Sequence, residues 1–263
     1  LDDRPIDPVA PDLLPFWLAW LAGAPQKLGG AAPLFRWAIR ASSLGLVDHA
    51  VLRTQAIDAH LSSALESGID QIVLLGAGLD ARAWRLPELA RTIVFEVDHP
   101  ATQAYKRARI GGRPPHAEVR YVAVDFERQR FASALEASGF RADSRVLWIW
   151  EGVAMYLQRA AIIDTLAQLS HLSAPGSELA ITYRVPDMLP FGRLGRATIP
   201  ALFQAAGEPL KGTLTSAELA STLAPEWAVL VDENSRGWKR LTGSQARPPR
   251  TFLGERLAIA RRV

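Results

Sequence analysis

The sequence of 263 residues contains no cysteine. This absence excludes disulfide bonds, a thiol nucleophile and metal sites built on cysteine. Long apolar stretches are missing too, because the longest uncharged run, Leu13 to Pro25, is too short to span a bilayer. The N-terminus also lacks the basic region followed by an apolar core that marks a signal peptide. We therefore expect a cytoplasmic protein that does not enter the membrane.

Lysine is scarce as well. It occurs only at positions 27, 106, 211 and 239, so arginine carries almost all of the basic charge. The net charge is +3, and the arginines are scattered among acidic residues rather than gathered on one segment. A basic patch is the electrostatic signature of nucleic-acid binding. We therefore expect a solvated, charged surface and no nucleic-acid partner.

The bulk composition is that of a soluble globular protein, with 49% hydrophobic and 22% charged residues. The length fits one domain with insertions. We divide it into a helical cap at 1–70, a cofactor-binding core at 71–185, a lid insertion at 186–214 and a C-terminal segment at 215–263 that completes the sheet. The lid is expected because its segment is rich in proline and glycine and is too long for an ordinary connection.

Apolar runs alternate with helical segments after residue 70. Most of the runs are continuously apolar, as expected for strands covered on both faces. This alternation predicts an α/β fold with a parallel, doubly wound sheet. The predicted strands are Ile72–Leu75, Ile93–Val97, Val119–Val124, Val146–Trp150 and Leu179–Tyr183, with two more within 228–231 and 252–260. The predicted helices are 47–65, 86–91, 101–109, 131–138 and 160–172, and a further helix starts at Thr215.

The stretch from Gln71 to His99 is the most informative. A strand runs into Gly76-Ala77-Gly78, a helical segment follows, and a second strand ends in Glu96-Val97-Asp98. A unit of this kind binds the adenosine part of a cofactor. It consists of a strand, a glycine turn, a helix and a second strand with an acidic terminus, all within about 30 residues. With Ala81 in the third position, the turn formally satisfies the dinucleotide fingerprint, so this motif alone leaves NAD open.

Asp80 weighs against a dinucleotide. It lies in the turn where a pyrophosphate would rest on a helix N-terminus, and its carboxylate would repel the phosphates. It suits a cofactor that is cationic there, such as S-adenosylmethionine (SAM), which carries an ammonium and a sulfonium and no phosphate. The alternative is that Asp80 caps the following helix.

Acidic residues follow successive predicted strands. Glu96 and Asp98 lie two apart on one strand and so face the same side, where Asp98 can bind both ribose hydroxyls. Asp125 with Phe126 follows the third strand and suits an adenine, while Glu151 follows the fourth. Ligands bind at the carboxyl ends of parallel strands. For each acid taken singly, a helix cap or a loop charge is the alternative.

Two arginines are candidates to bind the carboxylate of the methionine part of SAM through a bidentate pair. Arg53 lies in the helix that precedes the first strand, and Arg82 lies just after the glycine turn. The alternative for each is a surface arginine.

Five motifs occur in order along the chain, namely LLGAGLDARAWRL, VFEVDHPATQAYK, YVAVDFE, WIWEGVAMYL and GEPLKGTLTSAEL. Together they resemble the leucine carboxyl methyltransferase superfamily. The resemblance is closest to its bacterial branch of SAM-dependent O-methyltransferases, often linked to polyketide and other secondary metabolism, and covers roughly residues 47–235. The chain departs from the family at Ala81, where threonine is frequent, and in its N-terminal region, which lacks the usual acidic-aromatic opening.

The resemblance implies a Rossmann-like class I methyltransferase sheet of seven mostly parallel strands, with an N-terminal helical cap and a lid after the fifth strand. It implies that Arg53 holds the methionine carboxylate of SAM, with the glycine turn beside it, and that Glu151 lies beside the methionine part. It further implies that Asp98 holds the ribose, and Asp125 with Phe126 the adenine. Asp58, about one helical turn beyond Arg53, is a candidate to orient that arginine or makes an ordinary surface pair.

Candidates for contact with the methyl acceptor are Tyr156, after Glu151, and Tyr183 with Arg184, at the end of the fifth strand. A carboxylate acceptor needs no base, whereas a hydroxyl acceptor needs one. His99 is the histidine nearest to such a role, and its alternative is a turn residue. The histidines lack the spacing of a metal site, so we predict no metal.

The leading hypothesis is a SAM-dependent O-methyltransferase that acts on a carboxylate or hydroxyl of a small molecule. An NAD(P)-dependent reductase is the alternative that the glycine fingerprint allows. A protein-carboxylate methyltransferase and a binding module that has lost turnover are further alternatives.

Overall fold

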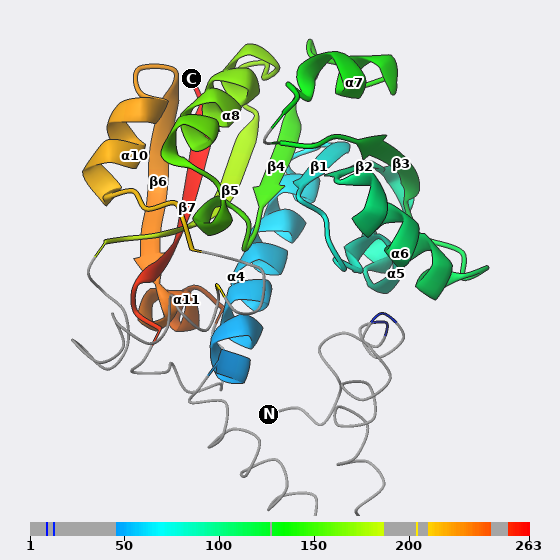
Figure 1. Cartoon of the computed structure of the whole chain (residues 1–263), viewed down its shortest axis with the longest axis horizontal. Coiled ribbons are helices and arrows are strands. Elements are labelled where there is room, and N and C mark those ends of the chain that lie inside the picture. The colour runs from blue at the N-terminus through cyan, green and yellow to red at the C-terminus, as the bar shows by residue number, and fades with distance from the viewer. Residues whose placement is uncertain are drawn as a thin grey trace, which may run out of the picture.

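The computed structural model describes residues 46–126, 128–186, 210–242 and 252–263, together with the single residues Val9, Leu13 and Gln204. Within these ranges a twisted sheet lies between two layers of helices (Figure 1). Most of the helical cap and of the lid expected from the sequence falls outside the described residues.

The sheet has seven strands in the order β3-β2-β1-β4-β5-β7-β6. The first five are parallel to one another, and β7 is antiparallel to both β5 and β6. This confirms the mostly parallel, seven-stranded sheet. The strands are β1 Gln71–Leu75, β2 Ile93–Asp98, β3 Glu118–Ala123, β4 Val146–Trp150, β5 Glu178–Arg184, β6 Trp227–Asn234 and β7 Glu255–Arg262.

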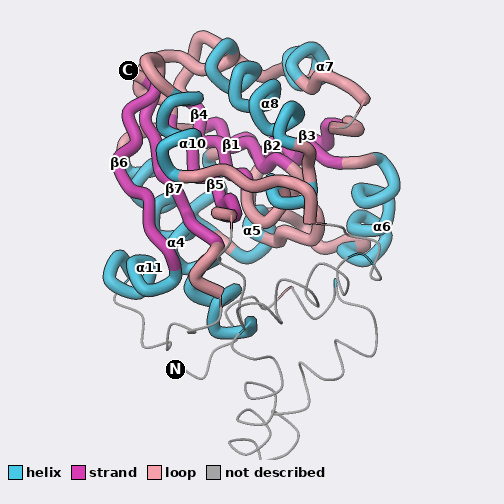
Figure 2. The backbone as a smooth tube through the Cα atoms, turned by 60° about the vertical axis from the view of Figure 1, so that its left-hand side comes forward, coloured by secondary structure: helices cyan, strands magenta, loops and turns pink. Residues whose placement is uncertain are grey.

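Helices cover both faces of the sheet, which explains why β1 and β4 are buried along their whole length. One face packs against α7 Ala132–Ala137, α8 Arg159–His171 and α10 Ser216–Leu223. The other face packs against α4 Leu46–Glu66, α5 Arg82–Arg85, α6 Pro100–Ile110 and α11 Ser235–Thr242. Two short 3₁₀ helices, η2 Pro87–Arg91 and η3 Ala154–Tyr156, complete the described elements. Figure 2 shows α11 beside α4, so that the C-terminal part of the chain supports α4.

Some described elements differ from the list of predicted helices, which also lacks the short helices α5 and η3. The segment predicted as a helix at 86–91 is a 3₁₀ helix that begins at Pro87. Helix α11 was not predicted, because its sequence contains Gly237 and only one buried large side chain, Trp238. The helix start at Thr215 is confirmed, and there Thr215 and Glu218 form a reciprocal capping box.

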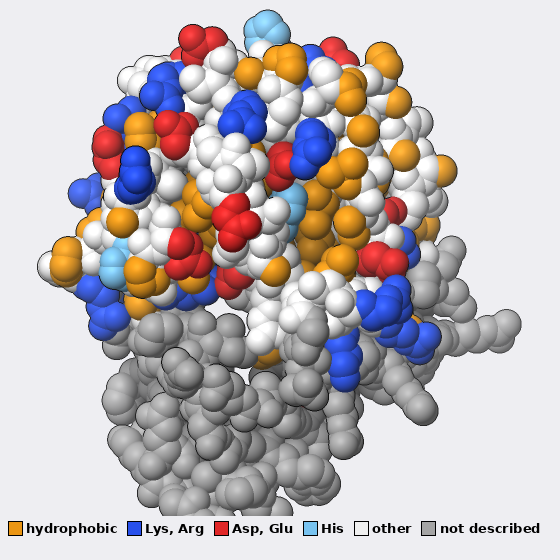
Figure 3. Space-filling view, turned by 180° about the vertical axis from the view of Figure 1, so that it is seen from behind, with side chains coloured by type: hydrophobic (Ala, Val, Ile, Leu, Met, Phe, Trp, Pro, Cys, Tyr) orange, Lys and Arg blue, Asp and Glu red, His pale blue; other side chains and the backbone are white. Residues whose placement is uncertain are grey.

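The described helices contain none that is long and apolar enough to cross a membrane. On the face seen in Figure 3, basic and acidic side chains are interspersed over most of the described surface. The absence of a nucleic-acid partner stays a prediction.

Glu96 corrects one prediction for the cofactor site. Its side chain is 1% exposed, and Lys106 Nζ of α6 lies 2.7 Å from its Oε1. Burial raises the pKa of Glu96 to about 7, although Lys106 acts in the opposite direction. Alternation along β2 fixes the face on which Glu96 lies, but α6 covers that face at this depth. Glu96 is therefore a partner for Lys106 inside the fold.

We predict that Lys106→Met destabilises the protein more at pH 8 than at pH 5. The variant leaves Glu96 buried without a cation, and breaking such a pair costs roughly 3–5 kcal/mol. Protonation of Glu96 would remove its buried charge. The free energy of this protonation rises by about 1.4 kcal/mol for each pH unit above the unfolded-state pKa, so it is small only at low pH. Urea unfolding at both pH values measures the difference.

The double variant Glu96→Leu/Lys106→Met is the control, since it removes both charges and should lose less stability at pH 8 than the single variant. Equal losses for Lys106→Met at the two pH values would contradict the assignment.

Candidate active site

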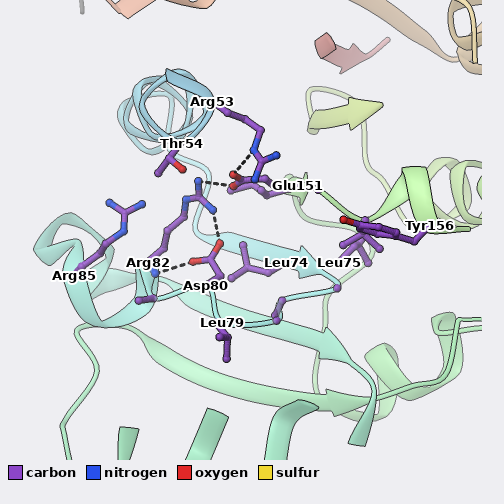
Figure 4. A pocket seen from close by; sticks show the side chains of 17 residues that line it. Arg53, Thr54, Leu74, Leu75, Leu79, Asp80, Arg82, Arg85, Glu151 and Tyr156 are labelled. Atoms are coloured by element: carbon purple, nitrogen blue, oxygen red, sulfur yellow. Dashed lines mark hydrogen bonds and ion pairs between the residues drawn. The ribbon is translucent and has the colours of Figure 1, made fainter. Parts of the chain in front are cut away.

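A cavity of about 460 Å³ opens at the carboxyl ends of β1 and β4. Three segments line it, namely the glycine turn from Gly76 to Arg82, the turn from Glu151 to Val153 after β4, and Arg53 with Thr54 on α4 (Figure 4). The chain runs from β1 outward to β2 and β3 on one side, and from β4 to β5 on the other. Such a reversal of strand order is where open α/β sheets bind ligands.

The glycine turn is held tightly against its neighbours. Gly76 has a φ of +66°, and a Cβ added there would lie 2.5 Å from Cγ2 of Val153. The amides of Gly76 and Ala77 both donate to the carbonyl of Val97, at 2.8 and 3.2 Å. The amide of Gly78 donates to the carboxylate of Asp98. The end of β2 therefore fixes the turn.

These bonds leave the turn poorly suited to a dinucleotide. A pyrophosphate needs free backbone amides and the N-terminus of a helix, but Gly76, Ala77 and Gly78 already donate within the protein. Helix α5 has only four residues, and its first amide, that of Arg82, donates to Asp80 Oδ1 at 2.7 Å. Asp80 thus occupies the position of the phosphates, and the reductase alternative is not supported.

Arg82 is surrounded by carboxylates. Its side chain is 3% exposed, and its Nε lies 2.7 Å from Asp58 Oδ1. Its Nη2 lies 2.8 Å from Glu151 Oε2, and its Nη1 is paired with Asp80. Burial alone would lower the pKa of Arg82, but the three acids outweigh burial and raise it. All three nitrogens of this guanidinium therefore already face a carboxylate, as Figure 4 shows for Asp80 and Glu151.

Arg53 lies across the cavity and shares Glu151 with Arg82. Its Nε donates to Glu151 Oε1 at 2.9 Å, and its Nη1 donates to Glu255 Oε1 at 2.9 Å. Burial would raise the pKa of Glu151, but the two arginines hold it at about 2. Glu151 is therefore ionised and bridges the two guanidinium groups.

The charges of this acid–arginine cluster do not cancel. Among the described side chains, three guanidinium groups face four carboxylates, which leaves one net negative charge. The cluster comprises Arg53, Arg82, Arg85, Asp58, Asp80, Glu151 and Glu255. An excess of acid beside a cavity favours a ligand with net positive charge.

Asp58 does not orient Arg53. It lies five residues further along α4, which is about 140° around the helix axis. From that side Asp58 pairs with Arg82 and with Nη2 of Arg85, at 2.7 Å in each case. Its role is to hold the arginines that follow the glycine turn.

The structure brings together most of the residues predicted to bind the cofactor. Asp98 lies beside the cavity, because its carboxylate accepts from Gly78 and from the amide of His99. The predicted residues that line the cavity are Arg53, Gly76, Ala77, Gly78, Asp80, Arg82, Glu151 and Tyr156.

Asp125 and Phe126 are not brought to this cavity. The carboxylate of Asp125 lies 3.5 Å from Arg128 Nε. The ring of Phe126 packs 6.0 Å from that of Phe131 and lines a separate groove beside α8. Both residues nevertheless follow β3, next to Asp98 on the neighbouring strand.

Of Tyr156, Tyr183 and His99, three of the candidates for the acceptor side, only Tyr156 lines the cavity. Tyr183 is 1% exposed, and its hydroxyl donates to the carboxylate of Asp232, so the prediction that it contacts the acceptor is wrong. Burial raises the pKa of Tyr183 to about 12. His99 is exposed and caps α6, where its Nδ1 accepts from the amide of Ala101.

Arg184 ends β5, and no acidic side chain in the described part of the chain pairs with it. Its Nε is buried and has no hydrogen-bond partner in the described part of the chain, and burial lowers its pKa. Alternation along β5 places it on the sheet face that carries α4, opposite to the face of Tyr183. It is paired in register with Glu255, which pairs instead with Arg53.

Sequence reasoning missed Glu255 and its neighbour His49. Glu255 starts β7, and because β7 is antiparallel its first residue reaches the same edge as the last residues of the parallel strands. In a parallel strand an acid at the carboxyl end marks the site, whereas in the antiparallel β7 an acid at the amino end does so. No metal site accompanies these residues, since the described residues include no group of three His, Cys, Asp or Glu placed to bind one.

The sequence matches the leucine carboxyl methyltransferase family over residues 7–170. The chain belongs to this family. It is 40% identical over 160 residues to a protein of Mycobacterium sp. (strain JLS) named "Putative S-adenosyl-L-methionine-dependent methyltransferase", which covers 60% of this chain and 48% of that protein. A protein of Mycobacterium avium (strain 104) with the same name is 39% identical over 166 residues, covering 62% of this chain and 53% of the relative. The chain thus spans about half the length of the curated relatives it matches.

Solved structures with the same fold are more distant in sequence. A DUF574 family protein from Streptomyces avermitilis has a TM-score of 0.62 and 18% identity, over 84% of this chain and 90% of that chain. The mitomycin 7-O-methyltransferase MmcR has a TM-score of 0.52 and 16% identity, over 92% of this chain and 60% of that chain. At this identity the likeness supports the class I methyltransferase fold of this family member.

We predict that Gly76→Ala destabilises the protein more than Gly78→Ala. Both glycines have positive φ, which costs about 1–2 kcal/mol for alanine. A Cβ at Gly76 also collides with Val153, and such overpacking adds about 1–3 kcal/mol, whereas at Gly78 the nearest atom is 3.8 Å away. Urea unfolding of both variants measures the difference.

The variant Gly76→Ala/Val153→Ala is the control for the collision. Adding Gly76→Ala to Val153→Ala should cost less than adding it to the unmodified protein, because the two methyl contacts at 2.5 and 3.0 Å are gone and only the contact with Cβ at 3.2 Å remains. If the cost of Gly76→Ala is the same with and without the valine methyl groups, their collision is not its cause.

Proposed function

We propose that this protein is a SAM-dependent methyltransferase and that the cavity between β1 and β4 binds SAM. The observation that carries the proposal is the net negative acid–arginine cluster beside a glycine turn whose amides are already bonded. SAM carries an ammonium, a sulfonium and one carboxylate, hence one net positive charge, whereas NAD carries two phosphate charges. Membership in the leucine carboxyl methyltransferase family supports the same activity.

Arg53 rather than Arg82 is proposed to bind the methionine carboxylate. Arg82 has a carboxylate at each of its nitrogens. Arg53 uses Nε and Nη1 for its two acidic partners, and no described residue bonds to its Nη2. A guanidinium nitrogen with a free N–H at the cavity wall is a strong donor to a carboxylate.

The cationic groups of SAM are proposed to lie near Asp80 and Glu151, which line the cavity. Asp98 is proposed to hold the ribose. Each of its oxygens accepts one backbone N–H, from Gly78 and from His99, and each retains a lone pair for a hydroxyl group. The adenine is proposed to lie toward Asp125 and Phe126 at the end of β3.

Bound SAM supplies an electrophilic methyl group on its sulfonium. The residues of this chain bind, orient and desolvate the reactants, which provides most of the rate in such a transfer. Tyr156 is proposed to orient the acceptor from the cavity wall. Arg184, which has no acidic partner among the described residues, is proposed to attract an anionic acceptor.

The acceptor is proposed to be an oxygen nucleophile on a small molecule, and a carboxylate is favoured over a hydroxyl. A carboxylate needs no general base, and the described residues that line the cavity include no histidine. A carboxylate on a protein would satisfy the same chemistry and is the alternative substrate.

Thermal shift tests the cofactor. SAM and S-adenosylhomocysteine should raise the melting temperature, because a ligand at a hundred times its Kd stabilises a protein by about 2.7 kcal/mol. NAD and NADP at the same concentration should not. Stabilisation by NAD or NADP alone would overturn the proposal.

Two variants test the placement of SAM. Arg53→Gln should weaken SAM by about 1.5–3 kcal/mol, the value of a hydrogen bond to a charged group, and should leave 5′-methylthioadenosine unaffected because that ligand lacks the carboxylate. Asp98→Ala should weaken both ligands by about 1–3 kcal/mol, because both contain the ribose. Isothermal titration calorimetry measures each affinity. Equal losses of both ligands in Arg53→Gln would mean that Arg53 does not bind the carboxylate.

A further inference from the structure

Two side chains behind the cavity wall support Arg53, one directly and one through the other. Glu255, at the start of β7, accepts from Arg53 Nη1 at 2.9 Å, across a separation of 202 residues. The other oxygen of Glu255 lies 2.6 Å from Nε2 of His49, which is one helical turn before Arg53 on α4. His49 is 1% exposed, and neither His49 nor Glu255 lines the cavity.

Glu255 fixes the direction in which Arg53 points. The guanidinium is planar, so once two of its nitrogens are held, the direction of the third is set. Glu151 holds Nε and Glu255 holds Nη1, both at 2.9 Å, and Nη2 is left beside Gly152 at the cavity wall. Without Glu255, Arg53 is free to turn and pair with Glu151 through two nitrogens, which would take the free donor away from the ligand.

His49 in turn fixes Glu255. Its ring packs between those of Trp238 on α11 and Phe252, with centroid distances of 5.0 and 5.4 Å. This packing directs Nε2 at Glu255, and Nδ1 is buried with no partner among the described residues. The hydrogen bond to Glu255 is therefore the only one that the ring makes within the described part of the chain, and losing it would leave both ring nitrogens unpaired.

We propose that His49 and Glu255 are positioning residues that hold Arg53 ready for the carboxylate of the cofactor. The inference rests on the proposed function and adds two residues to it that contact no ligand. It makes the final strand of the sheet a part of the cofactor site.

The chain offers a matched control on the same helix. His60 lies eleven residues after His49, three helical turns further along the same face of α4. Its Nε2 lies 3.0 Å from Glu178 Oε2 on β5, and Glu178 also pairs with Arg261. This is a second histidine–glutamate pair between α4 and the sheet, but it does not contact Arg53.

The experiment compares two ligands in calorimetric titrations. S-adenosylhomocysteine has the amino-acid part, and 5′-methylthioadenosine lacks it. We expect His49→Leu to weaken S-adenosylhomocysteine about five- to tenfold, within the range of coupled neighbours. The same variant should change 5′-methylthioadenosine less than twofold. His49→Gln, which keeps a donor toward Glu255, should recover most of the loss, and His60→Leu should show no preference between the ligands.

A double-mutant cycle shows whether the effect passes through Arg53. In an Arg53→Gln background, His49→Leu should cause no further loss of S-adenosylhomocysteine affinity. Glu255→Gln provides the same test if His49→Leu does not fold. A full additional loss in the Arg53→Gln background, or an equal loss of both ligands in His49→Leu, overturns the inference. If the unmodified protein binds neither ligand, the proposed function itself fails, and that result is distinct from either outcome above.

Discussion

The bridge of Glu151 between Arg53 and Arg82 is the interaction on which the site depends. It joins three elements that are separate in the sequence, namely α4, the turn after β1 and the end of β4. Each of the three groups is largely buried, so each needs the others to compensate its charge. Because the acids outnumber the arginines among the described residues of the surrounding cluster, the cavity has a negative character.

The same cluster decides what the glycine turn can bind. In a dinucleotide site the turn presents free amides to phosphate. Here the carbonyl of Val97 and the carboxylate of Asp98 have taken those amides, and Asp80 covers the start of a helix that is only one turn long. The glycines serve close packing against Val153 instead of anion binding. Two sites with the same glycine spacing can therefore favour ligands of opposite charge.

Much of the fold and part of the site could be predicted from the sequence, because they depend on local patterns. Largely apolar runs located the seven strands, and the acids after β1 and β4, Asp80 and Glu151, do line the cavity. The errors arise where a local pattern predicts the face or the end of a strand on which a residue lies, but not whether other elements cover it. Alternation predicted the face of Glu96, and the end of an apolar run predicted the position of Tyr183, but both side chains are buried. The pairing of Glu255 with Arg53 spans 202 residues, and no spacing rule reaches that far.

The antiparallel last strand explains how such a distant residue enters the site. A parallel strand delivers its last residue to the ligand-binding edge of the sheet, whereas an antiparallel strand delivers its first. Strand β7 lies between β5 and the edge strand β6, so Glu255 takes its position only when the C-terminal part of the sheet has formed. Helix α11 adds a second link, because its Trp238 packs on His49. Order in the candidate site is thus coupled to completion of the sheet, and any ligand that binds Arg53 would stabilise the C-terminal segment as well.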